Sequence, residues 1–304
     1  MNYQEFLTDI RTQLALRIGD NVTLEIRSFL KNNGTSYDGL VLLRPECNIS
    51  PAIYLMPYYH RYLQGISLED IYNDILTTCK QHEPKEDFDT TCFTDFSRAG
   101  KQIVMRLVNF EQNKERLNDI PYFRYYDLAV IFYYLLHADR EQQANILIHN
   151  HHLSLWGIDR DKLYALAKEN TPRLLPPQLI PMQMLAEEMP DYHRYPFAKN
   201  MPPLYILTNE YRTNGATALL YDGLLFDIAE LLKKDLLILP SSIHEILILG
   251  LDASDRQRLS HYNEMVQEVN ASHLLDEEVL SDHVYCYCRS EKILMMPSQM
   301  ASQK

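Results

Sequence analysis

The spacing of apolar residues along the chain predicts both helices and strands. Apolar side chains recur every three or four residues over 3–14 and again over 68–79, where Ser67 and Asp70 resemble a capping box at a helix start. Further helices are expected at 111–119, 159–168, 183–189, 223–234 and 255–269. Alternating or continuous apolar runs between turn residues predict strands at 21–30, 37–45, 52–56, 103–108, 128–136, 145–155, 204–207, 217–221, 236–239, 245–249, 284–288 and 293–296.

Two breaks in this pattern divide the chain into parts. Residues 82–100 form a polar stretch typical of an exposed connector, and residues 171–203 hold more than half of the chain's 15 prolines. Because proline fixes φ and lacks an N–H donor, the second break is expected to be an ordered strap without regular helix or a central strand, apart from the one short helix. The expected organisation is an N-terminal unit 1–90, a middle unit 101–170, the proline-rich strap 171–203 and a C-terminal unit 204–304.

The order of the predicted elements indicates the fold class. The helices that close the three units begin near residues 67, 159 and 255, at offsets of 92 and 96 residues, which suggests three αββα-like units. Amphipathic helices would cover mainly one face of each sheet. The expected class is therefore α+β, with mixed or mainly antiparallel sheets.

The charge and the cysteines bear on partners and compartment. The 304-residue chain has 41 Asp and Glu against 29 Lys and Arg, a formal charge of −12 that repels phosphate backbones and anionic lipid, so neither nucleic acid nor a membrane is an expected partner. The start of the chain lacks the layout of a secretory signal, and no apolar run is long enough to cross a bilayer. The five cysteines lack the spacing of a disulfide framework. Together these features predict a cytoplasmic protein.

A hydroxyl, an imidazole and a carboxylate lie close together in the last third of the chain. Ser241, Ser242, His244 and Glu245 are residue types used in nucleophilic catalysis, so a hydrolase is one hypothesis. Ser242 and His244 would share a strand face but stand far apart for a hydrogen bond, and no G-x-S-x-G turn is present. Because Pro-Ser-Ser is typical of an ordinary turn, the structural interpretation is favoured.

A second polar loop, 208–215, separates two predicted strands. Its Asn214-Gly215 pair is typical of a tight turn. The loop also offers ligand-binding candidates, because a helix N-terminus with free amides is expected nearby. These candidates are Asn209, Arg212, Asn214, Tyr221 and Asp222. No G-x-G-x-x-G or G-x-x-x-x-G-K-[ST] sequence is present, so no nucleotide cradle is expected and no cofactor is predicted.

Histidines and tyrosines form two further clusters. If 145–155 is a strand, His149 and His151 share a face and could supply two metal ligands. No H-E-x-x-H or C-x-x-C completes such a site, so no metal is predicted and these histidines are interpreted as strand-edge residues. The tyrosines of 58–62, which flank His60 and Arg61, are interpreted as core-edge residues, with a protein-binding patch as the alternative.

Three blocks of the sequence resemble one known family. They are Asn48-Ile49-Ser50-Pro51-Ala52-Ile53-Tyr54-Leu55, the L-T-N-x-Y-R-x-N-G-A pattern of 207–216, and L-P-S-S-I-H-E at 239–245. The chain is similar along nearly its whole length to an uncharacterised bacterial family known only as a domain of unknown function. The resemblance implies a cytoplasmic bacterial protein, and it implies no activity and no catalytic residue.

These patterns favour a binding function. The leading hypothesis is a cytoplasmic, non-enzymatic protein that binds another protein or a small ligand through its two polar loops, because both adjoin good strands and no complete catalytic set is present. The alternative is a hydrolase that uses Ser241 or Ser242 with His244 and Glu245.

Overall fold

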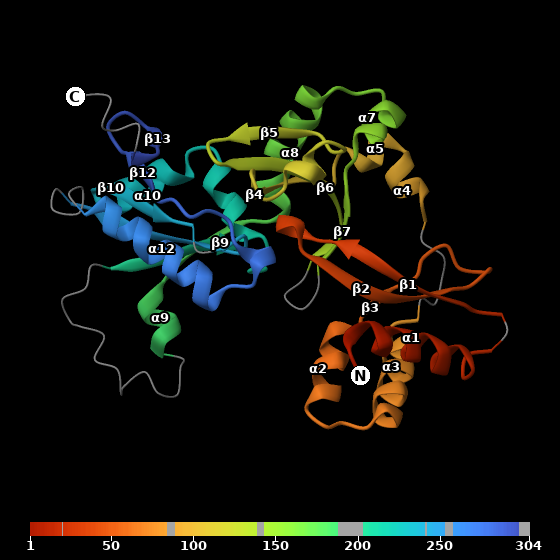
Figure 1. Ribbon diagram of the computed structural model, residues 1–304. Coiled ribbons are helices and arrows are strands. Elements are labelled where there is room, and N and C mark those ends of the chain that lie inside the picture. The colour runs from red at the N-terminus through yellow and green to blue at the C-terminus, as the bar shows by residue number, and fades with distance from the viewer. Residues whose placement is uncertain are drawn as a thin grey trace. The chain divides into compact units, whose positions relative to one another are not determined.

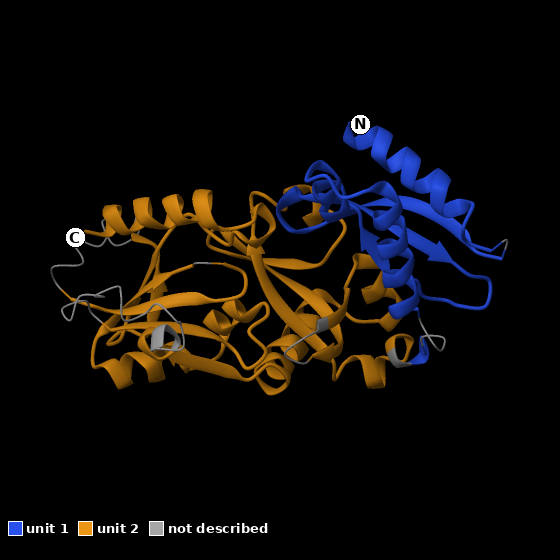
Figure 2. Ribbon diagram, turned by 90° about the horizontal axis from the view of Figure 1, so that it is seen from below, with its two compact units in different colours: residues 1–91 blue, residues 92–304 orange. Residues whose placement is uncertain are grey.

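The protein consists of two compact units, each with helices and an antiparallel sheet or sheets. The computed structural model describes residues 1–19, 21–83, 89–138, 143–187, 203–240, 242–252 and 258–297. The units are Met1–Thr91 and Cys92–Lys304, coloured blue and orange in Figure 2. Every strand pairing in these described residues is antiparallel, and the predicted α+β class is confirmed. None of the described helices is both long and apolar enough to cross a membrane.

In the first unit, three helices pack on a three-stranded sheet of order β1-β2-β3 (Figure 1). Side chains from the helices and from one sheet face form an apolar core around Phe6, Leu40 and Ile75. The elements are α1 (Tyr3–Ala15), β1 (Thr23–Leu30), the 3-10 turn η1 (Asn32–Gly34), β2 (Ser36–Leu43), β3 (Ala52–Tyr54), α2 (Met56–Leu63) and α3 (Leu68–Gln81).

Side-chain caps determine where two of these helices begin. Asn2 Oδ1 accepts a hydrogen bond from the N–H of Glu5 at 2.9 Å, and the Glu5 carboxylate accepts one from the N–H of Asn2 at 2.9 Å. Ser67 Oγ accepts a hydrogen bond from the N–H of Asp70 at 3.2 Å. The predicted starts of α1 and α3 are therefore confirmed.

The second unit contains two sheets. One has the order β4-β6-β5, with β7 also paired to β6, and the other has the order β13-β12-β10-β11-β9-β8. Its strands are β4 (Ile103–Asn109), β5 (Tyr122–Tyr125), β6 (Leu128–Ala138), β7 (Gln143–Leu147), β8 (Pro177–Pro181), β9 (Leu204–Asn209), β10 (Asp235–Leu239), β11 (Ile246–Leu251), β12 (Tyr285–Cys288) and β13 (Ile293–Met295). The helices from residue 91 onward are α4 (Thr91–Thr94), α5 (Phe96–Ala99), α6 (Lys114–Leu117), α7 (Asn150–Trp156), α8 (Arg160–Leu174), α9 (Met182–Glu187), η3 (Gly215–Leu220), α10 (Leu224–Leu232), α12 (Leu259–His273) and η4 (Asp276–Glu278).

The two sheets of the second unit share one apolar core. Phe132 of β6, Ile248 of β11 and Leu163 of α8 belong to a single buried cluster, to which α10 also contributes Ile228. The opposite face of the six-stranded sheet packs on α12 through Val266. Figure 1 accordingly shows α10 and α12 on opposite faces of this sheet. The shared core explains why residues 92–304 form one compact unit.

The free edge of β4 is closed by side chains from neighbouring elements. The N–H of Met105 donates to Thr171 Oγ at 2.9 Å, and the N–H of Leu107 donates to Thr217 Oγ at 3.2 Å. Asn170 Nδ2 donates to the carbonyl of Ile103 at 3.1 Å. Thr171, Thr217 and Asn170 are buried, and they satisfy these three outward polar groups of the edge strand without another strand.

Replacing Thr171 with valine is expected to lower the free energy of unfolding by about 1–3 kcal/mol, because valine keeps the shape and leaves the buried N–H of Met105 without an acceptor. Thr217→Val should cost a similar amount, because it leaves the N–H of Leu107 without an acceptor. Urea unfolding followed by the fluorescence of Trp156, the single tryptophan, measures both changes. The exposed-hydroxyl variant Ser272→Ala is the control, and equal losses in all three would contradict the role given to the edge.

Several predicted elements are wrong in detail. Residues 217–220 form part of the 3-10 segment η3 and Tyr221 caps it, so the predicted strand 217–221 is absent. The predicted strand 145–155 gives way after Leu147 to the helix α7. Helix α8 continues through Pro172, near its C-terminal end, where only the hydrogen bond to the carbonyl of Lys168 is lost. The strap contains β8, an edge strand, which is compatible with the expectation that the prolines allow no central strand there.

Most of the predicted strands are present in the described residues. The terminal hairpin and the strands near 103, 128, 204, 236 and 245 are confirmed, and α2, α5 and β5 are elements that the pattern missed. The helix predicted at 183–189 corresponds to α9, and its last two residues lie outside the described ranges. The threefold repeat stays a prediction.

Candidate functional site

Two polar loops of the second unit meet at one end of the six-stranded sheet. The first, 208–215, continues from β9, and the second, 242–245, precedes β11. β9 and β11 are antiparallel neighbours with Leu207 opposite Ile246, so the two loops lie at the same sheet end. We call 208–215 and 242–245 the paired loops. The structure therefore brings together the two regions that the sequence marks as candidates.

A single buried amide organises the first of the paired loops. Asn209 is 1% exposed, and its Oδ1 accepts hydrogen bonds from the N–H groups of Tyr211 at 3.0 Å and Thr213 at 3.4 Å. Its Nδ2 donates to the carbonyl of Thr213 at 2.8 Å. This self-contained network is a rigid Asx-type turn. Its consequence is that the tip of the loop is held in one conformation.

Arg212 occupies the tip of this loop. Its φ of +54° lies in the left-handed region, which costs a non-glycine residue free energy and is held here by the hydrogen bonds of Asn209. The side chain is exposed, and it makes no hydrogen bond or ion pair with any residue that the structure describes. Arg212 is therefore the outward-facing cation of the paired loops.

The imidazole of His244 links the two loops. Its Nδ1 accepts a hydrogen bond from the N–H of Asn214 at 3.2 Å, so the proton of the neutral ring is on Nε2, 3.7 Å from a carboxylate oxygen of Glu278. The carbonyl of His244 accepts a hydrogen bond from Thr208 Oγ at 2.8 Å. His244 thus holds the loops together through both its side chain and its main chain.

Gly215 lets the two loops approach closely. A Cβ atom at this position would lie 2.1 Å from Thr208 Oγ, 2.5 Å from the nitrogen of Asn209 and 2.7 Å from the carbonyl oxygen of His244. Two of these three neighbours are main-chain atoms that cannot move aside without moving a strand or a loop. Any side chain at residue 215 would therefore separate the paired loops.

Ser242 and Glu245 contact the main chain of their own turn. Ser242 Oγ accepts a hydrogen bond from the N–H of His244 at 3.0 Å, and the N–H of Ser242 donates to the carbonyl of Glu245 at 3.1 Å. Among the described contacts, neither the Ser242 hydroxyl nor the Glu245 carboxylate bonds the imidazole of His244. Ser241 lies outside the described residues. The hydrolase hypothesis stays a prediction, to be tested by activity.

The remaining ligand candidates make their contacts with α8 and the residue that follows it. Tyr221 is buried, its hydroxyl donates to the carbonyl of Leu175 at 2.8 Å, and burial raises the pKa of its phenol. Asp222 is exposed and lies 2.9 Å from Lys168 Nζ. Tyr221 thus secures the end of α8, and Asp222 forms a surface ion pair of small energetic value.

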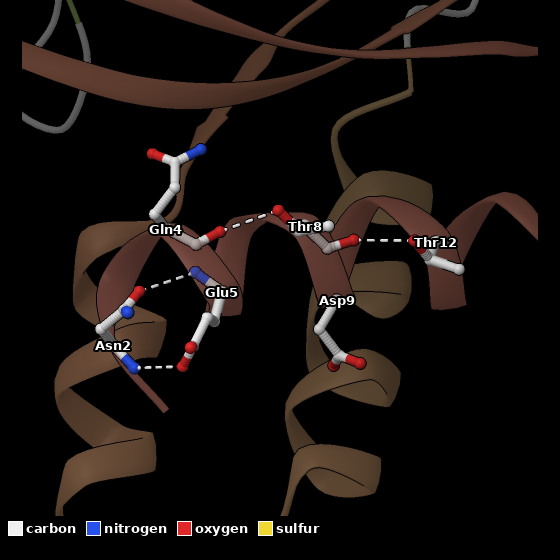
Figure 3. A pocket seen from close by; sticks show the side chains of 6 residues that line it. All are labelled: Asn2, Gln4, Glu5, Thr8, Asp9 and Thr12. Carbon is white, nitrogen blue, oxygen red and sulfur yellow. Dashed lines mark hydrogen bonds between the residues drawn. The ribbon is translucent and has the colours of Figure 1, made fainter.

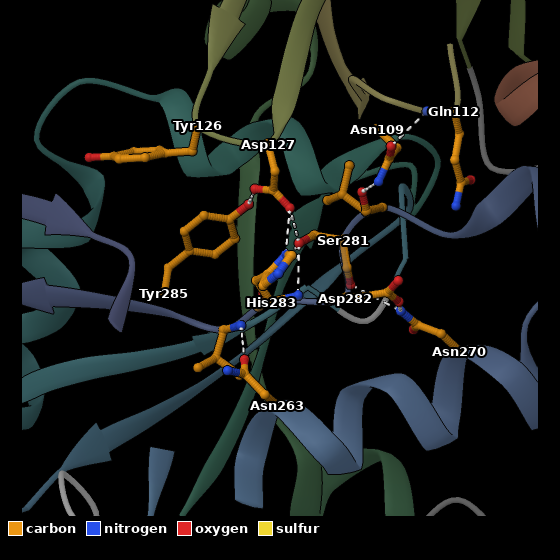
Figure 4. Close-up of polar contacts among 12 residues, drawn as sticks. Asn109, Gln112, Tyr126, Asp127, Asn263, Asn270, Ser281, Asp282, His283 and Tyr285 are labelled. Carbon is orange, nitrogen blue, oxygen red and sulfur yellow. Dashed lines mark hydrogen bonds and ion pairs between the residues drawn. The ribbon is translucent and has the colours of Figure 1, made fainter. Parts of the chain in front are cut away.

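A polar cluster that the sequence did not reveal surrounds Asp127 (Figure 4). Its carboxylate accepts hydrogen bonds from Ser281 Oγ at 2.5 Å and from the hydroxyl of Tyr285, and it lies 3.1 Å from His283 Nδ1. Ser281 and Tyr285 are fully buried, and burial followed by the charge of Asp127 raises the pKa of Tyr285. We call Asp127, Ser281, His283 and Tyr285 the Asp127 cluster.

The Asp127 cluster resembles an acid–base site only in its pairing of a carboxylate with a histidine. A carboxylate on Nδ1 orients an imidazole so that Nε2 faces outward, and the His283 side chain is 49% exposed. However, Ser281 donates to the carboxylate and accepts from the N–H of His283, so its hydroxyl is not placed at Nε2. In the described region the cluster therefore joins the segment 281–285 to the start of β6. Asp127 is 154 or more residues from the other three members, so no local pattern could have identified the cluster.

The histidine cluster near residue 150 lies at the start of a helix. His149 is the N-cap of α7, its Nδ1 lies 2.6 Å from a carboxylate oxygen of Asp119, and its ring centroid is 5.5 Å from that of His151. The shared strand face assumed for His149 and His151 is thus wrong. No group of three His, Cys, Asp or Glu side chains in the described ranges is arranged to hold a metal ion.

Acid is expected to destabilise the second unit through His152. Burial, followed by the charges of His151 and His149, lowers the pKa of His152 to about 4, against about 6.5 in an unfolded chain. Between these pH values the unfolded chain binds a proton that the folded chain does not, so stability falls as the pH falls from about 6.5 to about 4. The charge of Asp119 opposes this lowering of the His152 pKa.

Urea midpoints measured by Trp156 fluorescence across this pH range test the expectation. His152 Nδ1 accepts a hydrogen bond from the N–H of His149 at 2.9 Å, and glutamine can supply the same acceptor without titrating. His152→Gln should therefore flatten the pH dependence while preserving the start of α7. An unchanged slope in this variant would show that other groups cause the loss.

The first unit has two further surface features, a depression on α1 and the tyrosines of α2, and both belong to the structure of these helices. A shallow depression of about 460 Å³ runs along α1 (Figure 3). It is lined by Asn2, Gln4, Glu5, Thr8, Asp9 and Thr12, and its threonine hydroxyls donate to carbonyls of the same helix. The tyrosines of 58–62 lie on α2 and are partly buried against the core of the first unit, as the core-edge interpretation expects.

The comparison with known proteins gives a family without a function. The matching family model is described as a family of unknown function, DUF5688, and it covers residues 3–289. No curated protein and no solved structure matches the chain significantly. Because the family model covers nearly the whole chain, the resemblance drawn from the three sequence blocks is confirmed. The chain belongs to the DUF5688 family of unknown function.

Proposed function

We propose that this protein is a non-enzymatic binding protein that contacts a partner protein or a small ligand through the paired loops. The observation that supports it is the difference between Arg212 and its neighbours. Asn209, Asn214 and His244 are engaged in hydrogen bonds within the paired loops, whereas the exposed guanidinium of Arg212 has no partner among the described residues. A rigid loop that presents one unpaired arginine is suited to recognise an anionic group.

The loop is also pre-organised for binding. The network of Asn209 and the contact between Asn214 and His244 fix the main chain before any partner arrives. A partner therefore loses little free energy to ordering of the loop. The strained φ of Arg212 supports the same proposal, because strained residues cluster at functional loops.

The test compares Arg212→Gln with Arg11→Gln, which removes an exposed arginine from the first unit. The full chain and both variants are used to capture proteins from a lysate of the source cells, and small ligands are screened by thermal shift. Arg212→Gln should lose the specific partner or ligand at least about tenfold, a change of about 1.4 kcal/mol, while Arg11→Gln retains it. If Arg212→Gln retained the partner or ligand as well as Arg11→Gln does, the proposal would be wrong.

The hydrolase alternative has its own test. The full chain and His244→Ala are screened against esters, amides and phosphoesters. Turnover that disappears in His244→Ala would favour the hydrolase and would contradict a purely binding function.

We further infer that the protein acts in the bacterial cytoplasm. Among the described side chains, Cys47, Cys79, Cys286 and Cys288 form no disulfide, which suits a reducing compartment. Fractionation of source cells tests this inference, and recovery from an extracytoplasmic fraction would contradict it.

A further inference from the structure

Strand β1 lies at one edge of the three-stranded sheet of the first unit (Figure 1). It pairs with β2 on one side only, and the N–H of Lys31, directly after β1, donates to the carbonyl of Thr35 on that side at 2.7 Å. Main-chain groups alternate in direction along a strand of an antiparallel pair. The N–H and C=O groups of Leu24, Ile26 and Ser28 therefore point outward, away from β2.

The edge of β1 lacks the protection that the other long edges have. β8 begins with Pro177 and ends with Pro181, and β4 is closed by Thr171 and Thr217. The remaining edge strands of the described sheets have five residues or fewer, whereas β1 has eight and no proline. No described residue hydrogen-bonds the outward groups of β1. An edge of this length is open to pairing with another strand.

The middle of β1 carries one acidic and one basic side chain on the same face. Arg27 Nη2 lies 2.6 Å from Glu25 Oε2, and the arginine and glutamate side chains are 52% and 39% exposed. If two copies of β1 paired antiparallel about a two-fold axis at Ile26, Glu25 would lie opposite Arg27 of the partner subunit. The same symmetry would place Arg27 opposite the partner's Glu25. The charges of β1 are therefore complementary to a second β1.

The direction of the main-chain groups limits the registers that such a pair can adopt. Even-numbered residues must lie opposite even-numbered residues, because only these point outward. Moving the axis from Ile26 to Glu25 would place two glutamates opposite each other, and moving it to Arg27 would oppose two arginines. Like charges directly opposite are destabilising. Of these three registers, only the one centred on Ile26 pairs opposite charges.

Apolar side chains favour the same register. Leu24 and Ile26 face the core of the first unit but are only partly buried, so a neighbouring strand could bury them further. With the axis at Ile26, this side chain would lie beside Ile26 of the partner subunit. Phe29, which is also partly buried, would lie opposite the partner's Thr23. Aromatic and β-branched residues form favourable cross-strand pairs.

We propose that the protein forms a two-fold symmetric homodimer in which β1 pairs antiparallel with β1 of a second copy, centred on Ile26. Leu24, Ile26 and Ser28 of both copies exchange about six main-chain hydrogen bonds, and the two three-stranded sheets become one continuous sheet. A single charge in the middle of the edge would repel its own copy, whereas the pair of Glu25 and Arg27 attracts it. This inference goes beyond the proposed function, because it involves the first unit and neither of the paired loops.

The first test compares Ser28→Pro with Ser28→Ala by sedimentation velocity of the full chain over a range of micromolar concentrations. Both variants lose the contact of the exposed Ser28 hydroxyl with Ser36 Oγ. Proline also removes the outward N–H of residue 28, which the dimer needs and the pairing with β2 does not. Ser28→Pro should raise the dimer dissociation constant at least about tenfold, while Ser28→Ala dimerises as the wild type does. Circular dichroism verifies that both variants are folded.

The second test exchanges the charges. Glu25→Arg alone opposes arginines across the two-fold axis, and Arg27→Glu alone opposes glutamates, so each variant by itself should dimerise at least about tenfold more weakly than the wild type. An equimolar mixture of the two variants restores opposite charges at both positions and should form a heterodimer. A mixture that associates no better than the separate variants would overturn the register.

Hydrogen exchange locates the interface independently. The outward amides of Leu24, Ile26 and Ser28 should exchange more slowly as the protein concentration rises. A wild type that stays monomeric, or a dimer that Ser28→Pro leaves intact, would overturn the proposal. A monomeric wild type whose β1 amides become protected only when a different protein is added would replace the second copy with a foreign strand, and would also overturn it.

Discussion

Replacing Asp127 with alanine is expected to lower the free energy of unfolding of the second unit by about 3 kcal/mol or more, because the hydroxyls of Ser281 and Tyr285 lose their acceptor in a fully buried environment. His283 loses its contact with the carboxylate in the same change. Urea unfolding monitored by Trp156 fluorescence measures the effect.

The matched control for this prediction is Asp119→Ala. Asp119 also contacts a histidine Nδ1, that of His149, but its carboxylate is 73% exposed, so its loss is expected to cost about 1 kcal/mol or less. Tyr285→Phe removes one donor and keeps the ring, and it should lie between the two aspartate variants. A cost for Asp127→Ala no larger than that of Asp119→Ala would show that the Asp127 cluster does not stabilise the fold.

Replacing Gly215 with alanine is expected to cost about 3 kcal/mol, because the new Cβ would overlap main-chain atoms of both paired loops. The added atom cannot be relieved by a rotamer change, since Asn209 and His244 contribute main-chain atoms at 2.5 and 2.7 Å. The urea midpoint gives the loss of stability, and the partner affinity of the folded fraction should fall as well.

Gly250→Ala is the matched control for the glycine prediction. The three atoms nearest to its Cβ would all belong to the side chain of Lys234, the closest at 2.7 Å in a flexible chain that can move aside. This variant should change the free energy of unfolding by about 0.5 kcal/mol or less. If Gly215→Ala were as well tolerated as Gly250→Ala, the close contact between the paired loops would not exist.

Local sequence signals identified much of the fold because their causes are local. The serine at residue 67 and the apolar spacing after it determine α3, and proline at a strand end is compatible with β8 only because β8 is a sheet edge. The sequence marked both polar loops as candidates, but their juxtaposition comes from the pairing of β9 with β11, which no local pattern predicted.

The errors arose where a local pattern permits two structures. Residues 145–155 alternate in a way that suits a strand, yet Leu153 and Trp156 are also spaced for a helix, and Gly157 adopts a φ of +65° as its C-cap. Residues 217–221 alternate as well, but Thr217 is needed as an acceptor for β4, which is a tertiary contact. The Asp127 cluster joins segments distant in sequence, so no local rule predicts it.

The central claim is that the polar residues of the paired loops hold one another and leave Arg212 to meet a partner. Long-range proton–nitrogen NMR of His244 tests it directly, because the imidazole is the link between the loops. We predict that the neutral ring, without ligand, has an unprotonated Nδ1 that accepts from the N–H of Asn214 and a proton on Nε2. A proton on Nδ1, or the averaged signals of a freely exchanging ring, would contradict the claim.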